Sequence, residues 1–247
     1  MKVLITGGSG SLGRSLIKEY LQYPEVKLFS ITNDEYQHWE LEKDFDIKGY
    51  LCDIKEMARI GNVVSEIKPD VIIHAAAYKH VPFGERFPEE FYDTNVWGSY
   101  VMATIAKDYK VKKCILISTD KAVNPITKYG ISKQKAENIF LSYGCSVIRF
   151  VNFWGSRGSV IPLWQEQAKT KGCIEVTDPT MERYFITLED AAKFTIKCLN
   201  EYKPKTIWQP DNIKKWTLAE LANEVCPGVE QVIIGNRGNE KQCEELG

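Results

Sequence analysis

The chain has 247 residues, of which 44% are hydrophobic and 26% are charged, and its formal net charge is −1. These values are ordinary for a globular protein with one substantial core. The charge gives no support to nucleic-acid or polybasic membrane binding, and no apolar run reaches the ~20 residues of a membrane span. No signal peptide is visible, and seven scattered cysteines and three unclustered histidines indicate reduced thiols without a metal site. We therefore expect a cytoplasmic protein with no metal.

The first predicted element is a short apolar strand, Lys2–Thr6, which runs through a glycine turn into a helix over Ser11–Gln22. This order is typical of a dinucleotide site, and the alternative is a glycine-rich turn without a ligand. Gly7 permits the tight turn, Gly10 admits a pyrophosphate, and Gly13 lets the helix pack close to the strand. The N–H groups at the start of the helix suit the phosphates. The predicted cofactor contacts here are Gly7, Ser9, Gly10, Ser11, Leu12 and Gly13.

Strands and helices alternate over the first 150 residues, which predicts an α/β fold with a Rossmann-type doubly wound parallel sheet. Because ligands bind beyond the carboxyl ends of such strands, the glycine turn, Ala75–Ala77 and Ser118–Lys121 should converge on one cleft. The further expected strands are Val26–Ile31, Lys48–Cys52, Val71–His74, Lys113–Ile117 and Ser146–Phe150, and the further helices are Ile54–Ile67, Glu89–Lys107 and Lys128–Tyr143.

The alternation loosens after residue 150, so we expect two units. Residues 1–150 should form an NAD(P)-binding domain, and residues 151–247 a small C-terminal substrate-binding lobe. Helices are expected over Ile161–Thr170, Leu188–Asn200 and Thr217–Cys226. The second of these is amphipathic and should return to the nucleotide-binding domain.

Two acid–base pairs stand close together in the sequence. Tyr129 and Lys133 are one helical turn apart, and a nearby ammonium favours the phenolate, so the tyrosine can act as a base. Just upstream, Thr119, Asp120 and Lys121 supply a hydroxyl, a carboxyl group and an amine at the end of an apolar strand. Together the pairs indicate an oxidation combined with an elimination. The alternative for Asp120 and Lys121 is a solvated charge pair in a loop.

These residues carry a family resemblance. Thr6–Gly13 together with Tyr129 and Lys133 resembles the extended short-chain dehydrogenases/reductases. Further segments are similar to the nucleotide-sugar 4,6-dehydratases of polysaccharide biosynthesis, above all the inverting UDP-N-acetylglucosamine 4,6-dehydratases of pseudaminic acid biosynthesis. Those segments are His74–Pro82, Ser118–Pro125, Gly155–Pro162 and Arg183–Thr187. The resemblance implies a homo-oligomeric lyase that acts on a UDP-sugar with tightly bound NADP or NAD.

The resemblance also implies the reaction steps. Tyr129, aided by Lys133, would take the proton of the sugar 4-hydroxyl, which Thr119 would orient. Lys121 would be the base at C5 and Asp120 the acid for the departing 6-hydroxyl. Lys121 must then be neutral, and we expect desolvation and the positive nicotinamide ring to lower its pKa. Retaining relatives often have methionine at the position of Tyr129, so the tyrosine indicates inversion at C5.

The choice of cofactor depends on the end of the second strand. Thr32 can bind a 2′-phosphate, but Asn33 replaces an arginine of the family pattern, which leaves NADP and NAD open with a preference for NADP. A plain turn and helix cap is the alternative for Asn33. Asp53 and Ile54 resemble the adenine contact, and Asp53 could equally cap the following helix. The other predicted cofactor contacts are Ala75, Ala76, Ala77, Lys79, Tyr129 and Lys133.

The predicted substrate contacts come from several loops, and surface positions are the alternative for most of them. Arginine forks suit phosphate oxygens, so two arginines are candidates for the diphosphate or uridine. Asn95, within an expected helix, resembles the asparagine that orders the active site. The predicted substrate contacts are Lys79, His80, Asn152, Arg157, Ser159, Arg183 and Arg237.

Two other classes of protein function are compatible with the sequence. A 4-epimerase or 4-ketoreductase would need only Thr119, Tyr129 and Lys133, which leaves Asp120 and Lys121 without a task. A non-catalytic NADP-binding relative would be expected to lack the tyrosine or the lysine of the pair.

Overall fold

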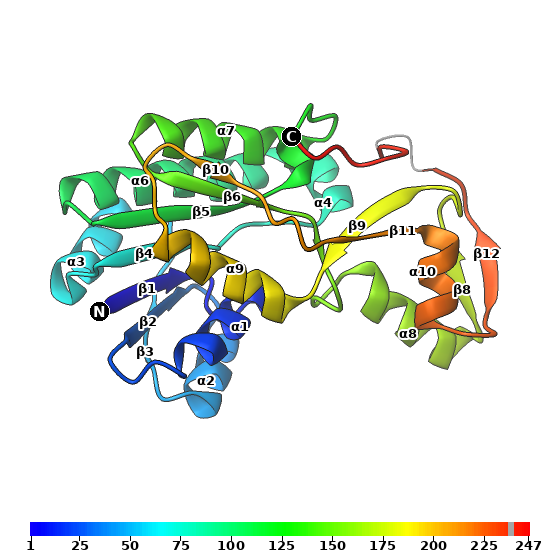
Figure 1. The fold of residues 1–247 in the computed structure, drawn as a ribbon, viewed down its shortest axis with the longest axis horizontal. Coiled ribbons are helices and arrows are strands. Elements are labelled where there is room, and N and C mark those ends of the chain that lie inside the picture. Colours follow the sequence, from blue (N-terminus) through cyan, green and yellow to red (C-terminus); the bar gives the residue numbers. More distant parts are fainter. Residues whose placement is uncertain (237–239) are drawn as a thin grey trace.

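The computed structural model describes residues 1–236 and 240–247 and has a large α/β domain beside a smaller lobe (Figure 1). Within the described residues, the large sheet has seven parallel strands in the order β10-β6-β5-β4-β1-β2-β3. This confirms the expected Rossmann-type fold. The chain reverses its direction of winding between β1 and β4, where such sheets bind ligands. The strands are β1 Lys2–Thr6, β2 Lys27–Thr32, β3 Lys48–Leu51, β4 Val71–His74, β5 Lys113–Thr119, β6 Ser146–Phe150 and β10 Ile207–Trp208.

Helices cover both faces of this sheet, and alternate strand residues point to opposite faces. Val3 and Ile5 pack in the core under α1, α2 and α9, whereas Leu4 packs under α3, α6 and α7. No helix in the described part of the chain is long and apolar enough to cross a membrane. The helices are α1 Ser11–Tyr20, α2 Glu35–Asp44, α3 Met57–Ile67, α6 Gly98–Asp108, α7 Lys128–Ser142 and α9 Leu188–Asn200.

The smaller lobe has its own apolar core, centred on Trp164, which is 1% exposed. Its strands form a three-stranded sheet, β11-β9-β7, and a two-stranded sheet, β12-β8. Residues 188–208 leave the lobe and pack on the large domain as α9 and β10, and a return of the helix over residues 188–200 was expected from the sequence. The lobe elements are β7 Asn152–Phe153, α8 Val160–Lys171, β8 Cys173–Val176, β9 Glu182–Ile186, β11 Lys214–Thr217, α10 Leu218–Val225 and β12 Glu230–Ile233.

Two helical regions differ from the sequence prediction. The expected helix Glu89–Lys107 is divided into α5 Pro88–Phe91, a π-helix over Tyr92–Trp97, and α6, and it is preceded by α4 Val81–Arg86. Pro88 separates α4 from α5, because proline lacks the N–H group that would continue α4. The unpredicted α2 begins after Asp34, whose Oδ1 accepts a hydrogen bond from the N–H of Gln37 (3.0 Å).

Candidate functional site

The glycine turn fits a dinucleotide. Gly7 has a positive φ of 70°, and a Cβ there would lie 2.9 Å from the Cα of Ala76, so the turn and the loop after β4 approach closely. A Cβ on Gly13 would clash with the carbonyl oxygen of Gly7. The N-cap residue of α1 is Gly10, which has no side chain that could cap the helix. The first N–H groups of the helix are therefore left for an anion. The turn can therefore hold a diphosphate.

The other predicted cofactor residues surround this turn. The Oγ1 of Thr32 accepts hydrogen bonds from Ser9 Oγ (3.2 Å) and from the N–H of Asp34 (3.3 Å), and Asn33 is exposed. The cap of α2 is thus Asp34 rather than Asn33. Asp53 Oδ1 accepts from the N–H of Lys55 (2.9 Å), in a turn that precedes α3. The side chains of Leu12 and Ile54 lie in the two cores, which leaves only their main-chain groups for a cofactor contact.

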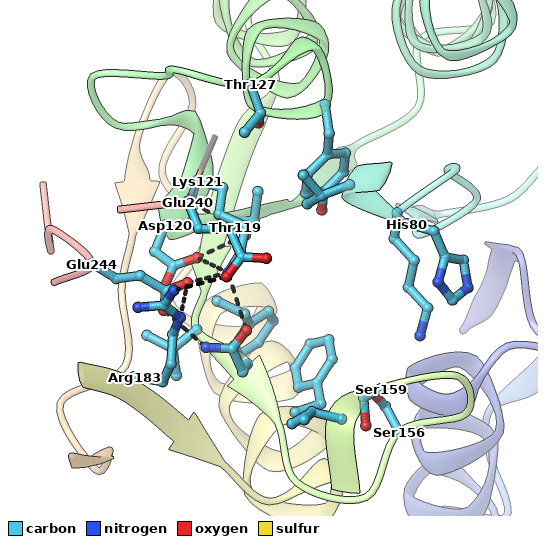
Figure 2. A pocket seen from close by; sticks show the side chains of 18 of the residues that line it. His80, Thr119, Asp120, Lys121, Thr127, Ser156, Ser159, Arg183, Glu240 and Glu244 are labelled. Atoms are coloured by element: carbon cyan, nitrogen blue, oxygen red, sulfur yellow. Dashed lines mark hydrogen bonds and ion pairs between the residues drawn. The ribbon is translucent and has the colours of Figure 1, made fainter. Parts of the chain in front are cut away.

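The five predicted catalytic side chains line one cavity of about 540 Å³, at the junction of the large domain and the lobe (Figure 2). Thr119 ends β5, and residues 120–122 form a short 3₁₀ turn after it. Tyr129 and Lys133 come from α7. This helix can approach the turn closely because Gly130 has no Cβ, which would clash with the carbonyl oxygen of Lys121. The sequence therefore brings both acid–base pairs to the same place.

Lys121 is held by three oxygen acceptors. Its Nζ lies 3.3 Å from Asp120 Oδ1, 3.0 Å from Asn152 Oδ1 and 2.5 Å from Glu244 Oε1 (Figure 2). Thr119 Oγ1 also donates to Asp120 Oδ1 (2.8 Å). Asp120 is 2% exposed, and its Oδ2 has no hydrogen-bond partner among the described residues. The carboxyl group of Asp120 also shares a side-chain hydrogen bond with Glu244.

The charges at this site differ from the expectation for Lys121. Burial lowers the pKa of its ammonium, but the carboxylates of Asp120 and Glu244 oppose burial and raise the pKa above its usual range. Burial raises the pKa of Asp120, but the Lys121 cation and the hydrogen bonds with Glu244, Thr119 and Lys121 together outweigh burial and lower the pKa below its usual range. The expected lowering for Lys121 does not hold in the free protein, because Glu244, which is distant in the sequence, places a second carboxylate beside the ammonium. The resting site is an ion-paired cluster.

The Tyr129–Lys133 pair is buried. Lys133 Nζ donates to the carbonyl oxygen of Ile117 (2.8 Å), and burial lowers its pKa to about 8, against the opposing charge of Glu137. Burial raises the pKa of Tyr129 to about 12, although the Lys121 cation and a hydrogen bond with Thr119 lower it. The free protein therefore holds Tyr129 as a neutral phenol. The Lys121 cation favours the phenolate form of Tyr129.

Glu244 is the site residue that the sequence analysis missed. Its side chain is 5% exposed, its Oε2 accepts from Asn152 Nδ2 (2.8 Å), and its Oε1 lies 3.6 Å from Arg183 Nε. Burial raises its pKa to about 7, against the lowering effect of Lys121. No periodicity marks this position in the sequence.

The predicted substrate residues divide into two groups. His80, Ser159, Asn152 and Arg183 line the cavity with the catalytic residues. Arg183 also forms an ion pair with Glu240 (3.7 Å). Arg237 lies outside the described residues.

Arg157 belongs to the second group and lies on the glycine turn. Its guanidinium donates to the carbonyl oxygen of Ser9, and its N–H donates to Ser11 Oγ (3.0 Å). Lys79 lines the cavity and donates from Nζ to the carbonyl oxygen of Arg157 (2.6 Å). Arg157 thus lies where the cofactor diphosphate is predicted, away from Asn152 and Arg183.

Asn95 links two segments of the site from the π-helix. It is 1% exposed, and its side chain bonds both main-chain groups of Tyr78: the N–H donates to Oδ1 (2.8 Å), and Nδ2 donates to the carbonyl oxygen (3.0 Å). Nδ2 also donates to Ser132 Oγ (2.9 Å), which donates to the carbonyl oxygen of Tyr129 (2.7 Å). Irregular π-turns are frequent at functional sites. Asn95 therefore orders the loop after β4 relative to α7.

Comparisons with known proteins show the family of the chain. The family model described as polysaccharide biosynthesis protein matches residues 3–247. A UDP-N-acetylglucosamine 4,6-dehydratase (inverting) of Campylobacter jejuni is 33% identical over 253 residues, which cover 97% of this chain and 75% of that one. A UDP-glucose 4-epimerase of Rickettsia akari is 30% identical over 263 residues, with coverage of 99% and 76%. The X-ray structure of Pen from Bacillus thuringiensis has a TM-score of 0.91 and 31% identity, with coverage of 98% and 79%.

Proposed function

Because the chain belongs to the polysaccharide biosynthesis protein family, among nucleotide-sugar dehydratases and epimerases, we propose that it is an inverting UDP-N-acetylglucosamine 4,6-dehydratase. The observation that carries the proposal is that Asp120 and Lys121 share one cavity with Thr119, Tyr129 and Lys133. Oxidation at C4 needs only the last three residues. Elimination of water across C5 and C6 needs a further base and a further acid. The product would be a UDP-4-keto-6-deoxy-N-acetylhexosamine.

The proposed cofactor is NADP or NAD, held by the glycine turn between β1 and α1. When bound, it would supply the hydride acceptor for C4 and the hydride donor for C6, so no net oxidation would occur. The N–H groups at the start of α1 would bind the diphosphate, and Thr32 lies at the position that distinguishes the two cofactors. Cytoplasmic location, a homo-oligomeric state and pseudaminic acid biosynthesis stay predictions.

In the first half of the reaction, Tyr129 takes the proton of the sugar 4-hydroxyl. Its phenol must ionise first, and burial alone opposes this, since the pKa of the free protein's Tyr129 is about 12. The Lys121 cation and the hydrogen bond with Thr119 favour the phenolate. The ammonium of Lys133 adds to this effect when a ligand fills the cavity. Thr119 orients the oxygen that loses the proton.

In the second half, the 4-ketone makes the C5 proton acidic. Lys121, as the neutral amine, removes that proton. Asp120 is a carboxylate in the free protein, so it first takes up a proton from solvent and then gives it to the 6-hydroxyl, which leaves as water. Lys121 then returns a proton to C5. Delivery to the opposite face of the ring would give the inverted product.

A UDP-hexose 4-epimerase is the second candidate, supported by the identity to the Rickettsia enzyme. Such an enzyme would oxidise C4 and reduce it from the other face, with Thr119, Tyr129 and Lys133. Asp120 and Lys121 would have no part in the chemistry.

The test is proton NMR of the holoenzyme with UDP-N-acetylglucosamine in D₂O, after bound cofactor has been verified. A new C6 methyl signal with deuterium at C5 and coupling constants of the inverted ring supports the proposal. A methyl signal with the original C5 configuration supports a retaining dehydratase. A C4 epimer without a methyl signal supports the epimerase instead.

A further inference from the structure

Glu244 is a buried carboxyl group that has no role in the proposed reaction steps. The segment over residues 240–247 carries it into the cavity, where it points towards Asp120 and Lys121 (Figure 2). Its two oxygens contact Lys121, Asn152 and Arg183. A buried carboxylate with this many partners is costly to desolvate and is retained in sites where its charge matters.

The charged groups that face Glu244 come from several elements. The turn after β5 supplies Asp120 and Lys121, β9 supplies Arg183, and α7 supplies the phenol of Tyr129. On its own segment, Glu240 pairs with Arg183 (3.7 Å). Lys241 and Glu245 lie 3.5 Å apart and pair with each other. Glu244 therefore interacts mainly with the proposed C5 base and its neighbours.

Lys121 has to lose a proton before it can act as a base. All three of its acceptors are oxygens of this cluster, and two of these acceptors are carboxylates. Asp120 Oδ1 is farther away, at 3.3 Å, and also accepts a hydrogen bond from Thr119. Glu244 Oε1 is at 2.5 Å. Glu244 is also the more basic carboxylate, because burial raises its pKa to about 7.

Building on the proposed dehydratase activity, we propose that Glu244 accepts the proton by which Lys121 becomes the neutral amine that attacks C5–H. One N–H bond of Lys121 breaks and an O–H bond forms on Glu244 Oε1, so an ion pair becomes a neutral pair with the same number of protons. Substrate that fills the cavity displaces water, which disfavours the ion pair. After Lys121 has returned its proton to C5, it regains the proton from Glu244. Glu244 thus acts through Lys121 as a positioning residue.

The first test follows the titration of Glu244 by infrared difference spectroscopy of the holoenzyme. Glu244→Gln removes the carboxyl group with little change in shape, and the adjacent, exposed Glu245→Gln is the matched control. We expect a protonated-carboxyl band that disappears as the pH rises through about 7 in the wild type and in Glu245→Gln, and that is absent in Glu244→Gln. Titration of Glu244 at the ordinary value of about 4.3 would make it too weak a base and would overturn the inference. This titration needs no turnover, so a failure of the inference can be distinguished from a failure of the proposed function.

The second test is the pH dependence of deuterium incorporation at C5. In the wild type, the rate of deuterium incorporation should rise with pH and become constant above pH 7. Lys121 and Glu244 then hold between them the single proton that the exchange needs. In Glu244→Gln, Lys121 must lose its proton to solvent, so the rate at pH 7 should fall and then rise about tenfold per pH unit. Glu244→Asp, which keeps a carboxylate, should restore a level profile. A uniformly lower rate with an unchanged profile would mean that Glu244 only supports the fold. A wild type that makes no methyl product would refute the dehydratase proposal separately.

Discussion

The Nζ of Lys121 lies 2.5 Å from Oε1 of Glu244, so the lysine proposed as the C5 base is ion-paired in the free protein. This pair joins the turn after β5 to the segment over residues 240–247. It explains why the pKa of Lys121 is raised rather than lowered, and it places a proton acceptor beside the base. The proposed elimination thus starts from a site in which Asp120, Lys121 and Glu244 form one ion-paired cluster.

The role of Asp120 separates a dehydratase from an epimerase. Asp120→Asn should lower dehydration by about 10²–10⁴-fold, the usual range for a general acid. Reduction of the bound cofactor by substrate, read as nicotinamide absorbance, should continue, because C4 oxidation uses other residues. Asp108→Asn, an exposed change at the end of α6, is the control and should be neutral. Full dehydration by Asp120→Asn would rule out its role as the acid.

Tyr129 should be required for the first step. Tyr129→Phe removes the phenolic oxygen and should slow C4 oxidation by about 10²–10⁴-fold, so that no reduced cofactor accumulates in a single turnover. Tyr109→Phe, at an exposed position after α6, provides the matched control. If the variant still reduces the cofactor at the wild-type rate, another group must take the 4-hydroxyl proton.

Arg157 should act on the cofactor. Because it bonds the glycine turn through Ser9 and Ser11, Arg157→Ala should weaken binding of NADP or NAD by about 10- to 100-fold, as expected for a lost charged hydrogen bond. Calorimetric titration of the cofactor-free protein measures this. Arg86→Ala on α4, whose guanidinium stacks on Phe87, is the control. Weaker UDP-sugar binding with unchanged cofactor binding would instead support the sequence-based prediction that Arg157 contacts the substrate.

Lys133 should make stability depend on pH. Burial lowers its pKa to about 8, whereas the unfolded chain keeps a value near 10.5. Between these values the unfolded state binds more protons, so the free energy of unfolding should rise with pH from about 8 to about 10. At ~1.4 kcal/mol per unit, the gain is about 3 kcal/mol. Urea unfolding of the wild type and of Lys133→Met at several pH values measures it, since the variant should lack the rise. Parallel pH curves for the two proteins would show that Lys133 titrates normally.

The local features of the site could be predicted from the sequence. The glycine turn, the strand that precedes it, and the spacing of Tyr129 and Lys133 depend on backbone geometry within a few residues. Thr119, Asp120 and Lys121 follow a buried strand, and the carboxyl ends of parallel strands meet at one edge of the sheet. These rules were enough to place the five catalytic side chains in one cavity and to predict the fold.

Other features required the tertiary structure, because they depend on contacts between distant segments. Glu244 and Arg157 received their partners only when residues 240–247 and the loop after β7 packed against the large domain. The strands of the lobe have two to five residues, too few for a hydrophobic period to be visible. The protonation of Lys121 and Tyr129 likewise depends on burial and on charges brought from elsewhere, which outweigh the effects of their sequence neighbours. The sequence by itself determined which chemical groups are present and where the chain turns; the tertiary structure decided which of those groups share a proton, because electrostatic interactions depend on distance in space and on exclusion of water.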